Sequence, residues 1–223
     1  MPIQNTGGTT YQKELKCMNK NLIIVFVRNP ELGKVKTRLS KTIGDSAALK
    51  IYMSLLNLTE SVLNLITADK VVYYSEGIQF NDLWSALHYQ KKLQRGSDLG
   101  ARMEHAFETA FQDLYEKVVI VGSDLYDLSP THIENAFEAL ENHDLVIGPS
   151  LDGGYYLLGM KELHSAVFKN KLWGTDAVLK STLKDLKQQN VKLLEVLNDI
   201  DTYEDLKAHP ELLKTIKKDE EIY

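Results

Sequence analysis

The sequence predicts an α/β protein in which a mostly parallel sheet is covered by helices on both faces. Short apolar segments, typical of buried strands, alternate with longer segments whose apolar residues recur every three or four positions, as on one helix face. This alternation favours a three-layer α/β/α arrangement. Since no Gly/Ser-rich linker, internal repeat or low-complexity tract interrupts it, we expect a single domain over residues 21–223. Residues 1–20 lack the apolar core of a secretory signal, and we expect a flexible extension there.

The first strand is expected at Leu22–Val27, a run of apolar residues with no polar face, as in strands buried on both sides. Asn29-Pro30 ends it, because proline donates no hydrogen bond and restricts the residue before it. Three cations follow Gly33 closely: Lys34, Lys36 and Arg38. Ligands of open α/β sheets bind beyond the carboxyl ends of strands. This basic loop is therefore a candidate phosphate site, with an ordinary solvated loop as the alternative.

The remaining elements follow in order along the chain. Further strands are expected at Lys70–Ser75, Val118–Val121, Leu145–Ile147, Tyr155–Met160 and Val191–Leu197. Helices are expected across Ile51–Leu65, Phe80–His88, Met103–Leu114, Pro130–Glu141 and Leu179–Leu186, and at Lys214–Tyr223 as a solvated helix end. Ser129-Pro130 has the pattern of a helix cap followed by proline at the first helical position. Thr202 and Asp205 resemble a capping box, with Asp in place of the usual Glu or Gln.

Composition excludes several classes of function. The formal net charge of -5 argues against nucleic acid as the main partner, and the local positive charge in the first loop suits a small anionic ligand. The single cysteine, Cys17, rules out an internal disulfide framework and fits a reducing compartment such as the cytoplasm. No apolar run approaches the roughly 18 residues of a membrane span.

Acidic residues recur just beyond predicted strand ends: Asp124, Asp152, Asp199 and Asp201. Magnesium is typically held by one or two carboxylates, with phosphate and water oxygens completing six ligands. Together with the basic loop, these residues therefore predict a magnesium–phosphate site. Each has a plainer alternative: Asp124 and one of Asp199 and Asp201 could cap helices, the cations could be surface residues, and Gly153-Gly154 could be a tight turn.

Other chemistries find no support in the sequence. The G-x-x-x-x-G-K-[ST] and G-x-G-x-x-G patterns are absent. The six histidines show no metal-ligand spacing, and with one cysteine a zinc site is improbable. Ser123 has no histidine at a recognisable spacing, so a hydrolase triad is unsupported.

Five segments in order resemble a known bacterial family: LIIVFVRNPELGKVKTRLSKTIG, QRGSDLGARM, VIVGSDLYDLS, LVIGPSLDGGYYLLGM and DIDTYEDL. The family is the DUF2064 group, of the nucleotide-diphospho-sugar transferase type with the glycosyltransferase A-type (GT-A), Rossmann-like fold. It is similar to the molybdenum-cofactor cytidylyl- and guanylyltransferases and to phospholactate guanylyltransferase. The resemblance spans about Leu22 to Leu206.

The resemblance implies a role for individual positions. The nucleotide-phosphate loop would comprise Pro30, Gly33, Lys34, Lys36, Thr37 and Arg38, and the base or ribose would lie near Gln94, Asp98 and Leu99. Asp124 would bind the metal with Asp199 or Asp201, and the acceptor or sugar would face Asp152, Gly153, Gly154 and Tyr155. We expect catalytic roles for Asp124, Asp152, Lys36 and Arg38. One departure stands out, since the family usually has Cys-Pro where this chain has Leu125-Tyr126.

The function expected first is a transferase, dependent on Mg²⁺ or Mn²⁺, that uses a nucleotide-activated donor and acts as a glycosyltransferase. The alternative is a nucleotidyltransferase that releases pyrophosphate from a nucleoside triphosphate, which suits the three-cation loop. Further alternatives are a nucleotide-binding module without catalysis and a structural or interaction protein. The expected ligands are a nucleoside di- or triphosphate or a nucleotide sugar, together with a small-molecule acceptor.

Overall fold

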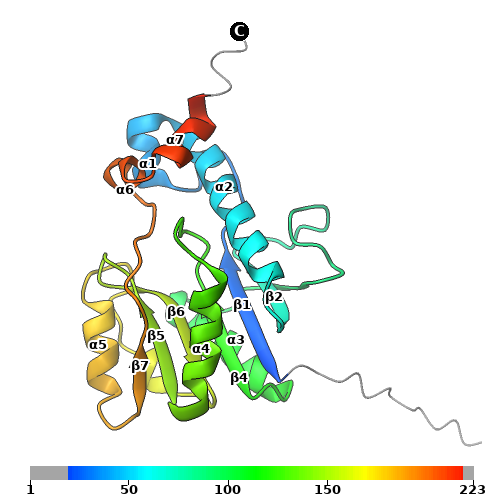
Figure 1. Ribbon diagram of the computed structural model, residues 1–223, viewed down its shortest axis with the longest axis vertical. Coiled ribbons are helices and arrows are strands. Elements are labelled where there is room, and N and C mark those ends of the chain that lie inside the picture. Colours follow the sequence, from blue (N-terminus) through cyan, green and yellow to red (C-terminus); the bar gives the residue numbers. More distant parts are fainter. Residues whose placement is uncertain (1–19, 218–223) are drawn as a thin grey trace, which may run out of the picture.

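The computed structural model describes residues 20–217 and contains one seven-stranded sheet, with the strand order β3-β2-β1-β4-β6-β5-β7 (Figure 1). Neighbouring strands are parallel except at β6, which runs antiparallel to both β4 and β5. The predicted mostly parallel sheet is therefore confirmed. The strands are β1 (Asn21–Val27), β2 (Asp69–Tyr74), β3 (Gln90–Leu93), β4 (Lys117–Val121), β5 (Leu145–Pro149), β6 (Tyr155–Met160) and β7 (Val191–Leu193).

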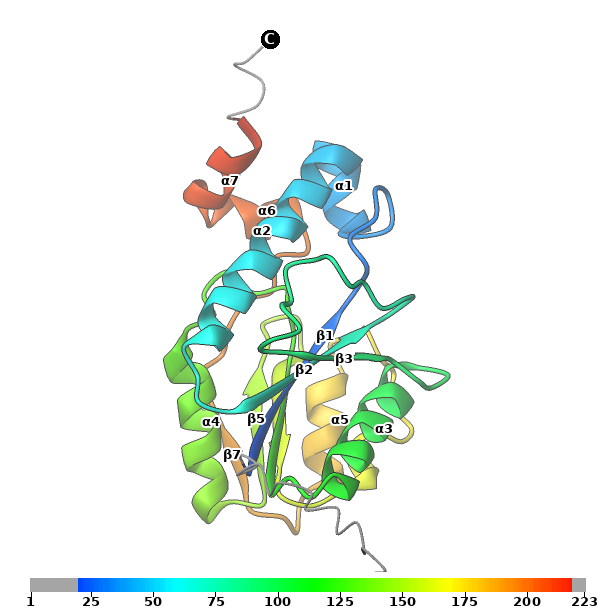
Figure 2. The same ribbon diagram turned by 90° about the vertical axis from the view of Figure 1, so that its right-hand side faces the viewer.

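Helices cover both faces of the sheet, as the three-layer prediction requires (Figure 2). One face packs against α2 (Asp45–Asn64) and α4 (Pro130–Asn142), and the other against α3 (Leu99–Gln112), α5 (Val178–Asp185) and the short 3₁₀ helix η1 (Ser165–Val167). Alternate residues of each central strand enter the two cores. In β1, Ile23 and Val25 face α2, whereas Leu22 and Ile24 face α3.

A third, smaller core lies beyond the carboxyl ends of the strands. It joins α1 (Thr37–Ile43) and the first half of α2 to α6 (Tyr203–Lys207) and α7 (Pro210–Lys217). Its buried members are Leu39, Ile51, Leu55, Ile200, Leu206 and Leu212. The helices α1 and α2, which follow β1 in the chain, are thereby packed against the end of the described chain, beyond the carboxyl ends of the strands (Figure 1).

The strand predicted at Tyr155–Met160 is present but runs against its neighbours. Only residues 150–154 separate it from β5, and antiparallel strands can be joined by so short a turn, whereas a parallel connection needs a dozen or more residues. Leu158 pairs with Ile120 on one side and Ile147 on the other. As a result, β6 begins at the edge of the sheet where the parallel strands end.

The predicted helix at Phe80–His88 is wrong, because this segment forms turns. Its conformation is fixed by Asp82, whose carboxylate accepts hydrogen bonds from the Trp84 amide, the Tyr74 hydroxyl and the Lys91 ammonium. Trp84 is buried at 2% exposure. These side-chain bonds replace the backbone bonds that a helix would make, and the segment leads into β3, an edge strand that the sequence did not predict.

Smaller differences concern element ends, and both predicted caps are confirmed. The last strand stops at Leu193 rather than Leu197, and α3 ends before Leu114, which is 82% exposed. Ser129 caps α4 with Pro130 in its first turn. In α6, the Thr202 hydroxyl accepts from the Asp205 amide while the Asp205 carboxylate accepts from the Thr202 amide.

Two predictions concern the chain ends. The extension expected over residues 1–20 lies, apart from Lys20, outside the described residues, as does the tail beyond Lys217. Within residues 20–217, none of the helices combines the length and apolar character needed to cross a membrane.

Candidate functional site

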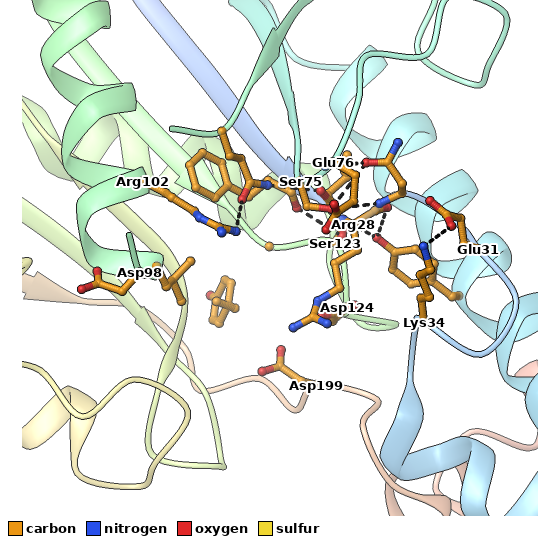
Figure 3. A pocket seen from close by; sticks show the side chains of 18 of the residues that line it. Arg28, Glu31, Lys34, Ser75, Glu76, Asp98, Arg102, Ser123, Asp124 and Asp199 are labelled. Carbon is orange, nitrogen blue, oxygen red and sulfur yellow. Dashed lines mark hydrogen bonds and ion pairs between the residues drawn. The ribbon is translucent and has the colours of Figure 1, made fainter. Parts of the chain in front are cut away.

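A cavity of about 590 Å³, here named the strand-end cavity, opens at the edge of the sheet where the parallel strands end. Residues that directly follow β1, β2, β3 and β4 contribute to its wall, as do the first residues of β6. Figure 3 shows side chains from these segments converging on it. Its lining includes Arg28, Lys34, Ser75, Gln94, Asp98, Leu99, Arg102, Asp124, Tyr155 and Asp199. Ligand sites of open α/β proteins lie at this position.

Lys36 connects the basic loop to the aspartates beyond the later strands. Its side chain is 3% exposed, and Nζ lies 2.7 Å from Oδ1 of Asp124 and 3.0 Å from Oδ1 of Asp201. Burial alone lowers the pKa of Lys36, but the two carboxylates together raise it by more, so the ammonium stays charged. The structure thus brings together the cations and aspartates that the sequence predicted would share one site.

The backbone of Lys36 is also unusual. It lies in the left-handed region with φ of 48°, at the residue that precedes α1. For a residue with a Cβ this conformation costs about 1 kcal/mol. Strained residues of this kind persist where surrounding contacts hold them, and the two carboxylates supply those contacts.

The other two cations of the basic loop are exposed. Lys34 lines the strand-end cavity, and its Nζ lies 2.6 Å from Oε2 of Glu31. Arg38 points instead toward Asp201, with 3.9 Å between Nη1 and Oδ2. Besides Lys34, the strand-end cavity is lined by Arg28, which follows β1, and by Arg102 of α3. Arg102 donates to the Gln94 side chain and to the Gly96 carbonyl oxygen.

Asp199 is the acidic residue whose protonation is most altered by its surroundings. Burial, together with the nearby charges of Asp124 and Asp152, raises its pKa to about 7, and a hydrogen bond from Ser150 and the charge of Lys36 oppose the change. Oγ of Ser150 lies 2.8 Å from Oδ2 of Asp199. The backbone of Asp199 forms an antiparallel bridge with Leu125. This bridge places the segment after β7 directly beside the segment after β4.

A second cavity, of about 340 Å³, shares Asp199 with the first, and we name it the aspartate cavity. Its lining comprises Arg38, Leu151, Asp152, Asn198, Asp199, Asp201, Thr202 and Asp205. Among the predicted acceptor residues, Asp152 lines this cavity, whereas Tyr155 lines the strand-end cavity. Asp199 therefore lies where a ligand in one cavity would meet a ligand in the other.

The carboxylates allow a test of the expected metal. Within residues 20–217, no three or more His, Cys, Asp or Glu side chains form a preformed metal cluster. Asp124 and Asp199 do line the same cavity, and their mutual repulsion contributes to the raised pKa of Asp199. A divalent cation between them would relieve this repulsion. The donor set thus fits a magnesium ion held by two carboxylates and completed by phosphate and water. Asp201 pairs with Lys36, as Asp124 does, but it lines the aspartate cavity and not the strand-end cavity.

The residues expected near the base or ribose line one part of the strand-end cavity. The side-chain nitrogen Nε2 of Gln94 donates to the carbonyl oxygens of Val27 and Tyr73 and so ties together the ends of three strands. Asp98 caps α3, since its Oδ1 accepts from the Ala101 amide at 2.9 Å. Leu99 is 44% exposed in the cavity. All three line the cavity, and two of them also have clear structural tasks.

Five further predicted positions line neither cavity: Pro30, Gly33, Thr37, Gly153 and Gly154. The three glycines lie in turns or bends, and Thr37 begins α1. Gly153 has φ of 86°, and a Cβ there would lie 2.4 Å from the Asp176 carbonyl oxygen. Oδ1 of Asp152 accepts from the Gly154 amide at 2.8 Å. The tight turn considered as the plainer alternative is therefore present, and it presents Asp152 to the aspartate cavity.

Several cavity residues were not found from the sequence, among them Arg28, Tyr52, Ser75, Glu76, Arg102 and Ser123. For Arg28 a signal existed, because it directly follows the first buried strand. For Tyr52 no signal existed, since it lies on the apolar face of α2 and only the fold brings its hydroxyl to the edge of the sheet.

Comparison with known proteins extends this description. Residues 58–175, more than half of the chain, match the family described as "Uncharacterized protein conserved in bacteria (DUF2064)". A 2-phospho-L-lactate guanylyltransferase from Methanocaldococcus vulcanius is 27% identical over 192 residues, 82% of this chain and 82% of that protein.

Solved structures show the same fold. A candidate nucleotide-diphospho-sugar transferase from Desulfovibrio desulfuricans G20 superposes with a TM-score of 0.76 at 31% identity, over 89% of this chain and 99% of that one. The 4-diphosphocytidyl-2C-methyl-D-erythritol synthase from Anaerococcus prevotii has a TM-score of 0.57 at 11% identity, over 87% of this chain and 98% of that one. The chain therefore belongs to the family DUF2064, and it is a transferase.

Proposed function

We propose that this protein is a nucleotidyltransferase, which binds a nucleoside triphosphate in the strand-end cavity, transfers its nucleoside monophosphate to a small acceptor and releases pyrophosphate. The observation that carries the proposal is the gathering of cations and carboxylates around one cavity: Arg28, Lys34 and Arg102 with Asp124 and Asp199. Phosphoryl chemistry needs both, since cations neutralise the phosphates and carboxylates hold a metal.

The relatives favour this reaction over the glycosyl transfer that was expected first. Two proteins at 26–27% identity are named guanylyltransferases, from Methanocaldococcus vulcanius and Methanocaldococcus jannaschii. Their names make GTP the first triphosphate to test and 2-phospho-L-lactate the first acceptor. Glycosyl transfer stays the second candidate, because the similar structure at 31% identity is named as a nucleotide-diphospho-sugar transferase.

In the proposed reaction an acceptor oxygen attacks the α-phosphorus, and the bond from that phosphorus to the bridging oxygen of the β-phosphate breaks. Pyrophosphate leaves with the electron pair of that bond. An acceptor hydroxyl gives up its proton, whereas an acceptor phosphate, such as that of 2-phospho-L-lactate, attacks through an oxygen that is already ionised. Arg28, Lys34 and Arg102 bind the phosphates and offset their charge. The acceptor occupies the aspartate cavity, where Asp152 orients it and, if the acceptor is a hydroxyl, takes its proton. Asp199, at the junction of the two cavities, faces the reacting groups.

Asp124 and Asp199 would hold the Mg²⁺, or Mn²⁺, which supplies positive charge to the phosphates and to the leaving pyrophosphate. Lys36 keeps Asp124 in place through their ion pair and adds a fixed positive charge beneath the phosphate site.

The test is to incubate the protein and MgCl₂ with ATP, GTP, CTP or UTP, each with 2-phospho-L-lactate and a panel of small acceptors, and with nucleotide sugars. Pyrophosphate and nucleoside diphosphate are assayed separately. Pyrophosphate release supports the proposal, whereas nucleoside diphosphate released from a nucleotide sugar would replace it with glycosyl transfer. A nucleotide-dependent rise in melting temperature without any product would indicate the binding module.

Substitution of Asp124 supplies the control on the site. We expect Asp124→Ala to abolish turnover in both transfer reactions, because it removes a proposed metal ligand and the partner of Lys36. The matched control is Asp113→Ala, which removes a surface aspartate that pairs with Lys92 at 3.3 Å and lines neither cavity, and it should leave turnover unchanged. An active Asp124→Ala variant would remove the support for the metal site.

A further inference from the structure

Among the cations that line the strand-end cavity, Arg28 is the one left free for a ligand. Lys34 is paired with Glu31, and Arg102 is bonded to Gln94 and Gly96. The guanidinium of Arg28 has no hydrogen bond or ion pair to another residue in the part of the chain that the structure describes. The residue is exposed, and Figure 3 shows its side chain reaching into the cavity.

The backbone of Arg28, in contrast, is held tightly by one buried side chain. The hydroxyl of Tyr52 accepts a hydrogen bond from the Arg28 amide at 2.9 Å and donates one to the Arg28 carbonyl oxygen at 3.0 Å. Tyr52 is 2% exposed and comes from the middle of α2. Burial raises the pKa of Tyr52 far above its ordinary value, so the hydroxyl keeps the proton that it donates.

This arrangement lies where the sheet can no longer hold the chain. The pairing of β1 with β2 ends at Val27 and Tyr74, so the next residue needs other partners for its backbone groups. Tyr52 satisfies both groups with one atom. Asn29 then ties the following turn to the loop after β2, donating to the Gly77 carbonyl oxygen at 2.7 Å. Arg28 thus has a fixed Cα and a free guanidinium.

We infer that Arg28 binds the phosphate chain of the nucleotide and that Tyr52 is the positioning residue that aims it. The inference rests on the proposed function, because it takes the ligand of the strand-end cavity to be a nucleotide. Arginine suits this task because its planar fork binds phosphate oxygens in pairs. A fixed backbone reduces the conformational entropy lost when the ligand binds.

The test measures the affinity of wild type, Arg28→Met, Tyr52→Phe and the double variant for GTP and GMP with MgCl₂, by calorimetry. If GTP does not bind, the triphosphate among ATP, CTP and UTP that does bind replaces it, together with its monophosphate. Matched controls are Arg95→Met, an exposed arginine just after β3 outside the cavity lining, and Tyr115→Phe, whose buried hydroxyl bonds Asp69 at 2.8 Å at the other end of β2.

For the triphosphate we expect a loss of affinity of about tenfold or more in Arg28→Met and of roughly threefold to tenfold in Tyr52→Phe. In the Arg28→Met background, Tyr52→Phe should cost less than about twofold, because the group that it positions is gone. Losses for the monophosphate should be smaller in both variants. A purely structural tyrosine would reduce affinity equally in both backgrounds and for both nucleotides.

Each outcome decides a different point. If the wild type binds none of the four triphosphates, the proposed function fails and this inference fails with it. If the wild type binds but Tyr52→Phe behaves like Tyr115→Phe, or its cost is the same with and without Arg28, only this inference is overturned. Should Tyr52→Phe not fold, the arginine variants decide, since equal affinities of Arg28→Met and Arg95→Met would overturn it.

Discussion

Nζ of Lys36 lies 2.7 Å from Oδ1 of Asp124, and this ion pair joins the loop after the first strand to the loop after β4. The lysine is buried, whereas the aspartate side chain is 45% exposed. The pair is therefore protected on one side and open to a ligand on the other.

Replacing Lys36 by methionine should destabilise the protein by about 2 kcal/mol. Removing one partner of a buried pair leaves an uncompensated charge, which costs roughly 3–5 kcal/mol when both partners are buried. The cost is smaller here because water reaches Asp124 and Asp201. Urea unfolding measures the change, and adding Asp124→Asn to Lys36→Met should recover part of it. The control is Lys41→Met, at an exposed position of α1, the helix that Lys36 precedes. An equal loss of stability there would contradict the prediction.

Asp199 predicts a specific dependence of stability on pH in metal-free buffer. Its pKa is about 7 in the folded protein, against 3.8 for an unperturbed aspartate, so the folded state holds a proton that the unfolded state releases. This contribution to stability is lost as pH rises toward 7. Asp199→Asn, which stays neutral, should therefore gain about 2 kcal/mol over the wild type between pH 5 and pH 8. Urea titrations with EDTA at both pH values measure this, and a pH-independent difference would contradict it.

Gly153→Ala should distort the turn that presents Asp152 to the aspartate cavity. Alanine at φ of 86° is strained, and its Cβ would lie 2.4 Å from the Asp176 carbonyl oxygen. We expect a loss of about 1–3 kcal/mol in stability. The KM for the acceptor should rise more than the KM for the nucleotide. Gly77→Ala is the control, because a Cβ there meets nothing within 4 Å. The idea would not survive if the two variants were equally stable.

Tyr126 should rigidify the loop after Asp124 by packing. Its ring centroid lies 4.8 Å from that of His209, and the preceding residue, Leu125, is fully buried. Tyr126→Ala should cost about 1–2 kcal/mol, and His209→Ala should add little to it, because both changes break the same contact. Thermal unfolding of the two single variants and the double variant gives the coupling, and strictly additive losses would speak against it.

The sequence predicted the layers of the fold well because a buried strand leaves a local mark. Continuous apolar runs identified β1, β4 and β5 without ambiguity. The edge strand Gln90–Leu93 has no such mark, since it is polar and half solvated. The direction of β6 was within reach, because residues 150–154 are too few for a parallel crossover. It was missed because an apolar run does not encode orientation.

For the site, position along the chain was informative and side-chain geometry was not. Residues that follow strands could be expected at one edge, and Lys36, Asp124 and Asp201 do meet there. No local pattern separates the buried Lys36 from the exposed Lys34 two positions earlier. The role of Tyr52 depends on how α2 crosses the end of β1, and that relationship exists only in the folded chain.

The packing of the last helices on the first ones also bears on biosynthesis. Asp201 emerges from the ribosome 165 positions after Lys36, and Leu206, which packs in the same core as Leu39, emerges later still. A nascent chain that stops short of these residues has Asp124 as a partner for Lys36 but lacks Asp201 and the apolar contacts that hold the basic loop. Translation must therefore pass α6 before the basic loop has all of the contacts that hold it in the finished protein.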